Sequence, residues 1–204
     1  RARPSAVSRA RQGGVAMAQC RLVAKADEPG SLKIRVAAKA AGVNLSVETS
    51  NKAAVPELHL GDRVVKYTSA ILRCLGKIYD GGDIYGNSFI ESAQVDSWLD
   101  WTDMELDCSA EPPQLEEAIE RIEKHLESRT FLVGQRCTLA DVSLSCSLHR
   151  LQQAGTLKSL PKAAQRWFGT CTAQPAFREA ASAKPPAAAK APAAAPAAAP
   201  AAAG

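Results

Sequence analysis

The stretch "RTFLVGQRCTLADVSLSCSL", residues 129–148, decides the fold of this chain. Its apolar run is interrupted at Thr138 and Asp141 before it resumes. Because these residues are three positions apart, the Thr138 hydroxyl oxygen can accept from the Asp141 amide while the Asp141 carboxylate reaches back to the Thr138 amide. The spacing therefore predicts a structural capping box that begins a helix from Leu139 to Leu151.

The helix after this box is too apolar for a protein surface. Residues 142–148, "VSLSCSL", carry no charge. A helix that is apolar on every side lies inside the protein, where water cannot satisfy its first amides. The internal cap then matters more than on an exposed helix, so the pair is expected to be structural rather than catalytic.

Strand and helix signals alternate in the first part of the chain. Pro29 near a helix start and Gly42 at its end delimit one helix, and a second follows at 68–79. Strand patterns occupy residues 20–25, 44–49 and 56–67, the last folded around a Gly61-Asp62 turn. The order strand, helix, three strands, helix predicts an α/β thioredoxin-like small domain at residues 18–80.

Strand signals cease after this domain. Residues 81–87 are expected to form an interdomain loop, and residues 88–182 an all-α domain whose first helix begins with a capping box of Ser88 and Glu91. Four acidic residues follow at spacings of three or four and are expected to form a solvated helix face: Asp96, Asp100, Asp103 and Asp107.

The two ends differ in composition from the body. Residues 1–17 form a basic leader, predicted to be disordered, whose Arg, Ser and Ala content is also typical of an organelle transit peptide at residues 1–16. Residues 183–204 hold Ala, Pro, Lys and a final Gly, which predicts a disordered linker.

Charge gives no sign of a nucleic-acid surface. Of the 25 basic residues, four precede Met17 and two lie in the tail, which leaves 19 against 21 acidic residues. The body is slightly acidic, so direct nucleic-acid binding is not expected. The tryptophans, including Trp98, Trp101 and Trp167, are expected in the core or an interface, because a base-stacking platform would be interleaved with Arg and Lys.

Neither a metal site nor a membrane segment is expected. The six cysteines form no CxxC, and the three histidines, His59, His125 and His149, are dispersed. No apolar run approaches the roughly 20 residues that span a bilayer. A soluble protein of a reducing compartment follows, cytoplasmic unless residues 1–16 direct it to an organelle.

The quoted stretch resembles the capping-box motif in the helical domain of the glutathione transferase fold. "SRTFLVG", "LADVSL" and "RWFGTCTAQPAFR" are similar to elongation factor 1-gamma, and "IYGNSFIESAQVDSWLDW" is similar to that factor and to the N-terminal appendages of cytosolic aminoacyl-tRNA synthetases such as glutamyl- and methionyl-tRNA synthetase. The resemblance covers about residues 18–182. It implies a thioredoxin-like domain followed by an all-α glutathione transferase C-terminal-like domain.

The resemblance also implies where a glutathione site would lie. A transferase activates the thiol of glutathione with a hydroxyl or thiol at the first strand-helix turn. In "VAKADEPGSLK" the only hydroxyl is that of Ser31, a weak catalytic candidate, because a residue just after Pro29 and Gly30 ordinarily serves the helix start.

Other parts of that site are retained as remnants. The element that holds the γ-glutamyl end is present as "YTSAI", with Thr68 and Ser69, but Tyr67 stands where an acid or amide is expected. Val55 and Pro56 resemble the Val-cis-Pro pair that binds the glutathione backbone. The segment before them, "ETSNKAA", is too short for the helix that usually completes the pocket.

Three functions remain open from the sequence. The first is a non-catalytic assembly module of the translation apparatus, in the elongation factor 1 complex or a multi-synthetase complex. It would need no cofactor and would dock on other transferase-like domains through its helical domain, with Arg129 and Arg166 as interface candidates. The alternatives are a glutathione-dependent transferase and an RNA-binding accessory.

Overall fold

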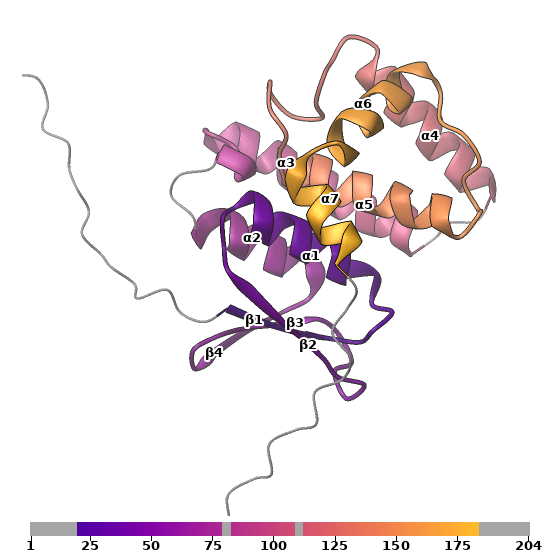
Figure 1. Ribbon diagram of the computed structural model, residues 1–204. Helices are drawn as coiled ribbons and strands as arrows, with labels where there is room; N and C mark the ends of the chain where they lie inside the picture. The colour runs from indigo at the N-terminus through magenta and orange to yellow at the C-terminus, as the bar shows by residue number, and fades with distance from the viewer. Residues whose placement is uncertain (1–19, 79–82, 109–111, 184–204) are drawn as a thin grey trace, which may run out of the picture.

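The computed structural model describes residues 20–78, 83–108 and 112–183 (Figure 1). The predicted leader, residues 1–17, and all of the predicted linker except Ala183 lie outside the described residues. Of the predicted interdomain loop, residues 83–87 are described, and Asp83–Tyr85 form the short 3₁₀-helix η1. We call residues 20–78 the sheet domain and residues 83–183 the helical domain.

The sheet domain contains a four-stranded mixed sheet in the order β2-β1-β3-β4. Strand β1 is parallel to β2 and antiparallel to β3, and β3 is antiparallel to β4 across the turn at Gly61, whose φ is 63°. The strands are β1 Cys20–Ala24, β2 Leu45–Thr49, β3 Glu57–Leu60 and β4 Arg63–Lys66. These elements confirm the predicted thioredoxin-like α/β layer.

Helices α1 Pro29–Ala40 and α2 Thr68–Ile78 cover one face of this sheet (Figure 1). Leu22 and Leu58 are neighbours across β1 and β3 and are fully buried. Since side chains alternate between the two faces of a strand, their neighbours Arg21 and His59 lie on the other face. The pattern is that of a sheet with one packed and one polar side.

The polar face of the sheet carries ion pairs between strands. Arg21 pairs with Glu48 at 2.9 Å, and Lys66 pairs with Glu57 at 2.8 Å. Between β2 and β3 the described chain forms no helix, as the short segment predicted. The polar outer side chains therefore fit a sheet that lacks a second helical layer.

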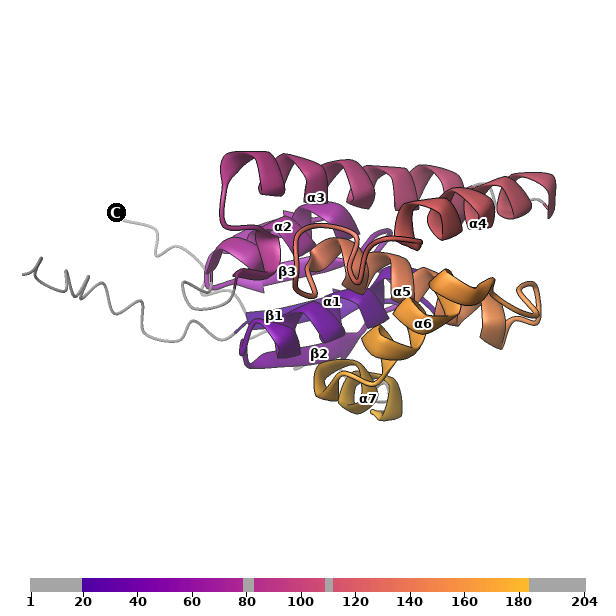
Figure 2. The same ribbon diagram turned by 90° about the horizontal axis from the view of Figure 1, so that it is seen from above.

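In the described residues the helical domain contains five α-helices and the short helical turns η1 and η2, and it packs on the sheet domain (Figure 2). Helix α1 lies between the sheet and two of them, α5 and α7. Residues 139–148 of α5 are all buried, as its apolar sequence predicted. The elements are α3 Phe89–Thr102, the π-helical turn η2 Asp103–Asp107, α4 Pro112–Leu126, α5 Leu139–Gln153, α6 Lys162–Thr172 and α7 Pro175–Ser182.

The buried side chains form one hydrophobic core that runs through both domains. It joins Leu22 and Ile34 of the sheet domain to Leu99, Leu144 and Trp167 of the helical domain. None of the helices in the described residues is both long and apolar enough to cross a bilayer. The domains are therefore two layers of one packed body.

Candidate functional site at the domain interface

The start of α5 confirms the predicted capping box. Thr138 and Asp141 close it reciprocally, and the Asp141 carboxylate accepts the Thr138 backbone N–H at 2.8 Å. The same carboxylate also accepts the backbone N–H of Leu132 at 3.0 Å and the indole N–H of Trp167 at 2.8 Å. Burial raises the pKa of Asp141, and these donors oppose that shift. The box joins α5, α6 and the loop before α5.

The glutathione-site remnants gather at one end of the sheet domain. A Cβ atom on Gly30, in the first turn of α1, would lie 2.0 Å from Thr68 Oγ1, so the two helix starts are in close contact. The carbonyl of Pro56 accepts the backbone N–H of Tyr67 at 3.1 Å. The structure therefore brings together the segments that the resemblance pointed to.

Ser31 lies in the first turn of α1 and is half-buried. Its backbone N–H donates to the carbonyl of Glu28 at 3.0 Å, a bond that closes the helix start. This bond does not involve the Ser31 hydroxyl, so a helix-start role of that hydroxyl and catalysis by it both stay predictions.

The bend at Val55 and Pro56 differs from the expected form. The peptide bonds of the described residues are all trans, so the Val55–Pro56 bond is not the cis bond that the resemblance implied. The Pro56 carbonyl is instead held by Tyr67, which has a φ of 71° and also accepts the N–H of Ile71 at 3.0 Å. Both backbone groups of this left-handed residue are thus satisfied within the fold.

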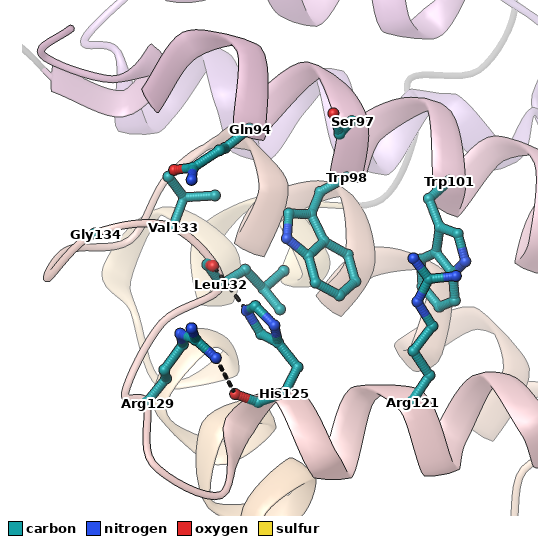
Figure 3. Close-up of a pocket in the computed structure, with 10 residues that line it drawn as sticks. All are labelled: Gln94, Ser97, Trp98, Trp101, Arg121, His125, Arg129, Leu132, Val133 and Gly134. Atoms are coloured by element: carbon teal, nitrogen blue, oxygen red, sulfur yellow. Dashed lines mark hydrogen bonds between the residues drawn. The ribbon is translucent and has the colours of Figure 1, made fainter. Parts of the chain in front are cut away.

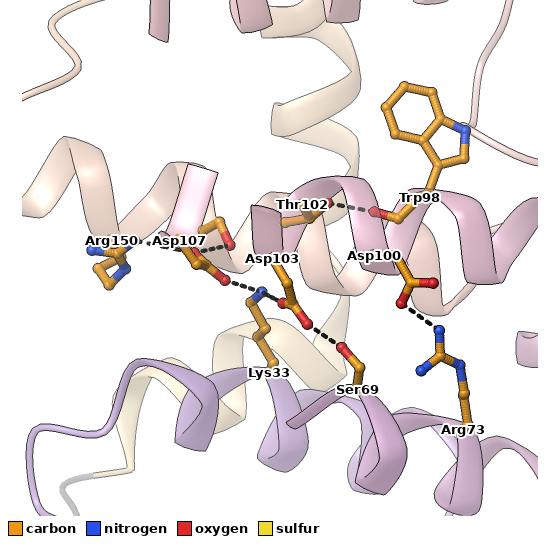
Figure 4. A network of polar contacts seen from close by, with 10 residues as sticks. Lys33, Ser69, Arg73, Trp98, Asp100, Thr102, Asp103, Asp107 and Arg150 are labelled. Carbon is orange, nitrogen blue, oxygen red and sulfur yellow. Dashed lines mark hydrogen bonds and ion pairs between the residues drawn. The ribbon is translucent and has the colours of Figure 1, made fainter. Parts of the chain in front are cut away.

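Ser69 is engaged by the helical domain (Figure 4). Its hydroxyl donates to the carboxylate of Asp103 in η2. The same carboxylate accepts from Lys33 of α1, with 3.3 Å between Lys33 Nζ and Asp103 Oδ1. A hydroxyl that was expected to face a ligand therefore bonds across the domain interface.

Lys33 forms the centre of this interdomain network. Its side chain is 2% exposed, and its Nζ lies 2.5 Å from Asp107 Oδ2. Asp107 also accepts from Ser147 at 2.9 Å and from Arg150 at 3.1 Å, both in α5. Burial alone would raise the pKa of Asp107, but Lys33 and these donors hold it below its ordinary value.

The π-helical turn η2 supplies both acceptors for Lys33. Its defining bond runs from the Cys108 N–H to the Asp103 carbonyl, five residues back, at 3.1 Å. Such single π-turns often occur at functional positions of helices. Here the turn lets Asp103 and Asp107 converge on Lys33 (Figure 4).

Arg73 of α2 makes a second connection to the helical domain. It bonds Asp96 at 2.7 Å and Asp100 at 2.6 Å, both in α3. Burial lowers the pKa of Arg73, but the two carboxylates outweigh it and raise the pKa above its ordinary value. Tyr85 donates to Asp96 at 2.8 Å, and its burial together with that bond raises its pKa to about 12.

The acidic stripe is only in part the solvated face that its spacing predicted, because Asp100 is exposed while Asp107 is largely buried. All four of its carboxylates bond basic or hydroxyl side chains of the sheet domain, of η1 or of α5. The partners Lys33 and Arg73 lie far away in the sequence, which is why helix spacing alone could not reveal them. The sequence did indicate that Lys33 is buried, because helix spacing places it on the same face of α1 as Gly30 and Ala37.

A pocket of about 280 Å³ lies on the helical domain (Figure 3), and none of the glutathione-site remnants is among its lining residues. It is formed by α3, α4 and the loop before α5. Trp98 packs edge-on against Trp101, with ring centroids 5.2 Å apart, and against His125 at 4.9 Å. The Arg121 guanidinium lies 5.1 Å from the Trp101 ring centroid. Sequence spacing did not indicate that Arg121 and Arg129 border these aromatic rings.

The two predicted interface arginines make local contacts. Arg166 donates to the carbonyls of Leu126 at 2.7 Å and Arg129 at 2.8 Å, and so caps the end of α4. Arg129 donates to the carbonyl of His125 at 3.2 Å and lines the pocket. Both residues are exposed, and a role in binding a partner stays a prediction. Among the described residues no group of three or more His, Cys, Asp or Glu side chains is arranged to hold a metal ion.

Comparison with known proteins identifies the class of this fold. Residues 105–175 match the family model described as glutathione S-transferase, C-terminal domain. A theta class glutathione S-transferase from Xanthomonas axonopodis pv. citri, solved with glutathione bound, superposes with a TM-score of 0.66 at 19% identity, over 81% of this chain and 98% of that one. Glutathione S-transferase III superposes at 0.71 and 20% identity, over 85% of this chain and 100% of that one. The chain has the glutathione transferase fold.

Its sequence relatives are proteins of translation. It is 34% identical to elongation factor 1-gamma of Trypanosoma cruzi over 59% of this chain and 34% of that protein. It is 32% identical to the bifunctional glutamate/proline–tRNA ligase of Cricetulus griseus over 79% of this chain and 10% of that protein. The chain thus spans about a third of the elongation factor and a tenth of the ligase. The chain therefore combines the glutathione transferase fold with sequence similarity to both kinds of translation protein.

Proposed function

We propose that this module is a non-catalytic assembly domain of the translation apparatus, which docks on other transferase-like domains through its helical domain. The observation that carries the proposal is the interdomain network at the glutathione-site remnants. Ser69 is bound to Asp103, and Lys33 is buried between two carboxylates. A glutathione molecule at this place would have to compete with the contacts that join the domains.

The relatives support the translational side of the proposal. Elongation factor 1-gamma and the glutamate/proline–tRNA ligase are both larger than the matched region. We propose that this module works in the cytoplasm as one domain of such an assembly, that its partners are translation factors or aminoacyl-tRNA synthetases, and that it needs no cofactor.

A reconstitution experiment tests the docking role. The full chain, tagged, is mixed with cell extract, and bound proteins are identified by mass spectrometry. Each translation protein found is then purified and tested for a stable complex by size-exclusion chromatography. We expect an elongation factor 1 subunit or an aminoacyl-tRNA synthetase to co-elute with the chain, and failure of every purified translation protein to co-elute would overturn the role.

The alternative, a glutathione-dependent transferase, is supported by the fold and by the hydroxyl of Ser31 at the first turn of α1. The test is retention on glutathione-agarose together with a conjugation assay that uses glutathione and an electrophile. We expect neither retention nor turnover. Clear turnover that Ser31→Ala abolishes, while Ser143→Ala in α5 leaves it unchanged, would replace the assembly role by the enzymatic one.

A further inference from the structure

The pocket between α3, α4 and the loop before α5 combines aromatic walls with positive charge (Figure 3). Among the described residues that line it, two are arginines and none is acidic. The body of the chain has more acidic than basic residues, so this concentration of positive charge runs against the overall balance. Local charge of one sign beside a concave surface attracts ligands of the opposite sign.

Both arginines are held in place without an acidic partner. Arg121 packs on the Trp101 ring, and Arg129 donates to the backbone carbonyl of His125. Within the described residues neither guanidinium forms an ion pair with a carboxylate. A guanidinium carries five N–H donors, so each retains donors for a carboxylate ligand.

The pocket walls are preorganised by contacts among themselves. His125 Nε2 donates to the Leu132 carbonyl at 2.9 Å, which fixes the ring beside Trp98. Trp98 and Trp101 are both half-buried, so each presents part of its ring to the pocket. Rigid aromatic side chains lose little entropy on binding and are frequent anchors for partner residues.

We propose that this pocket binds an acidic peptide segment of a partner protein. Carboxylates of the segment pair with Arg121 and Arg129, and one apolar side chain packs against Trp98 and Trp101. The inference rests on the proposed assembly function and names the chemistry of its docking point. The volume of about 280 Å³ lies just below the range of about 300–1,000 Å³ for small-molecule sites, which suits a few side chains.

Charge around the pocket favours a peptide over a nucleic acid. A phosphate backbone needs a stripe of cations along its path. Helix α4, which carries Arg121, also exposes Glu117 and Glu120, and Glu127 follows its end. These carboxylates would repel a long polyanion, whereas the charges of a short segment seated in the pocket meet Arg121 and Arg129.

The test is a titration of the full chain with the peptide acetyl-Asp-Glu-Leu-Glu-Asp-amide, read by tryptophan fluorescence. The peptide contains no tryptophan, and Trp167 is fully buried on Asp141, so a change reports Trp98 and Trp101. We expect saturable binding that weakens as salt is raised. The matched peptide acetyl-Asn-Gln-Leu-Gln-Asn-amide should give no saturable change.

Variants locate the binding. The double change Arg121→Gln with Arg129→Gln should weaken binding by about tenfold or more, because two charge-assisted contacts are lost. Arg63→Gln, at an exposed arginine of β4, should leave it unchanged. Since Arg121 and Arg129 are exposed, the double variant should keep the wild-type Tm.

Three results would overturn the inference. One is equal affinity of the double variant and the wild type for the acidic peptide. Another is displacement of the peptide by a single-stranded oligothymidylate that binds more tightly, which would mark a nucleic-acid site. The third is a double variant that still forms the wild-type complex with a translation protein; this would remove the pocket as the docking point but leave the assembly function standing.

Discussion

At the residue scale, Asp141 shows how one side chain can organise a domain. Its carboxylate accepts from the loop before α5, from the N-cap of α5 and from the indole of Trp167 in α6. All of these donors are buried, so water cannot replace the carboxylate as their hydrogen-bond acceptor if it is removed. The capping box was predictable because it is local, but the bond to Trp167 was not, since 26 residues separate the pair.

Asp141→Ala should therefore lower the free energy of unfolding by about 3–5 kcal/mol, because it leaves buried donors without an acceptor. Urea denaturation followed by circular dichroism measures the loss. The control is Asp62→Ala in the exposed β3–β4 turn, which should change stability by about 0.5 kcal/mol or less. A loss for Asp141→Ala as small as that of the control would contradict the role of the carboxylate as a shared acceptor.

Two helical glycines offer a second comparison between single residues. Gly30→Ala should destabilise the chain by about 1–3 kcal/mol, because the new Cβ would lie 2.0 Å from Thr68 Oγ1. Gly169→Ala in α6 meets nothing within 4 Å and should stabilise by about 0.5–1 kcal/mol through helix propensity.

Thermal unfolding of both glycine variants checks these opposite signs. Thr68→Ala added to Gly30→Ala should recover part of the lost stability, because it removes the Oγ1 atom. If Gly30→Ala proved as stable as Gly169→Ala, the starts of α1 and α2 would not be in close contact.

At the scale of elements, the continuation of α3 into η2 decides how the two layers meet. The sequence predicted a helix with a regular acidic stripe, and the helix is present. The predicted solvated face holds for Asp100 but misses the ion pairs of the stripe, because helix periodicity reports only neighbours three or four residues away. Lys33 is 70 residues from Asp103, and Arg73 is 23 residues from Asp96. Such pairs are set by the tertiary fold.

The network gives the protein a defined acid sensitivity. The folded chain holds the pKa of Asp107 below its unfolded value of about 3.9. The contribution of this group to stability is therefore complete above that pH and is lost as the pH falls through the folded pKa. Between about pH 5 and pH 2.5, Asp107→Asn should lose less unfolding free energy than the wild type.

Urea denaturation at a series of pH values measures this difference. Asp62→Asn, in the exposed β3–β4 turn, serves as the control and should follow the wild-type pH dependence. An equally steep decline in Asp107→Asn and in the wild type would show that the pairing of Asp107 with Lys33 does not supply the acid sensitivity.

At the scale of the whole molecule, the continuous core and the interdomain ion pairs make the two domains one unit. The order of strands and helices was predictable, because turns, caps and periodicity are local signals. The pocket beside Trp98 was not, since Arg121 comes from another helix and no local pattern connects the two. The trans bond before Pro56 also departs from the form that the resemblance implied.

Unfolding should accordingly be a single cooperative event. Tryptophan fluorescence follows the helical domain, which contains all three tryptophans, and hydrogen exchange of the β1 and β3 amides follows the sheet domain. Both signals should change at the same urea concentration. Lys33→Met should shift both by the same amount, a loss of about 2 kcal/mol, since it removes the buried cation that two carboxylates share.

The two domains would instead unfold separately if the strand amides exchanged at a lower urea concentration than the one at which tryptophan fluorescence changes. Lys39→Met provides the control. Like Lys33, Lys39 connects α1 to the helical domain, but it pairs with Glu179 of α7 and both side chains of that pair are exposed. Its removal should cost about 0.5 kcal/mol or less.

The bond between Ser69 and Asp103 ties a hydroxyl of the sheet domain to the turn that also pairs with Lys33. Freeing that hydroxyl for a tripeptide ligand means detaching η2, which also bears the carboxylates that neutralise Lys33. A variant selected for conjugating activity would therefore need a new counterion for Lys33 before any gain at Ser31 became useful. Asp103 bonds both Ser69 and Lys33, so a ligand that took the Ser69 hydroxyl would weaken a contact that joins the two domains.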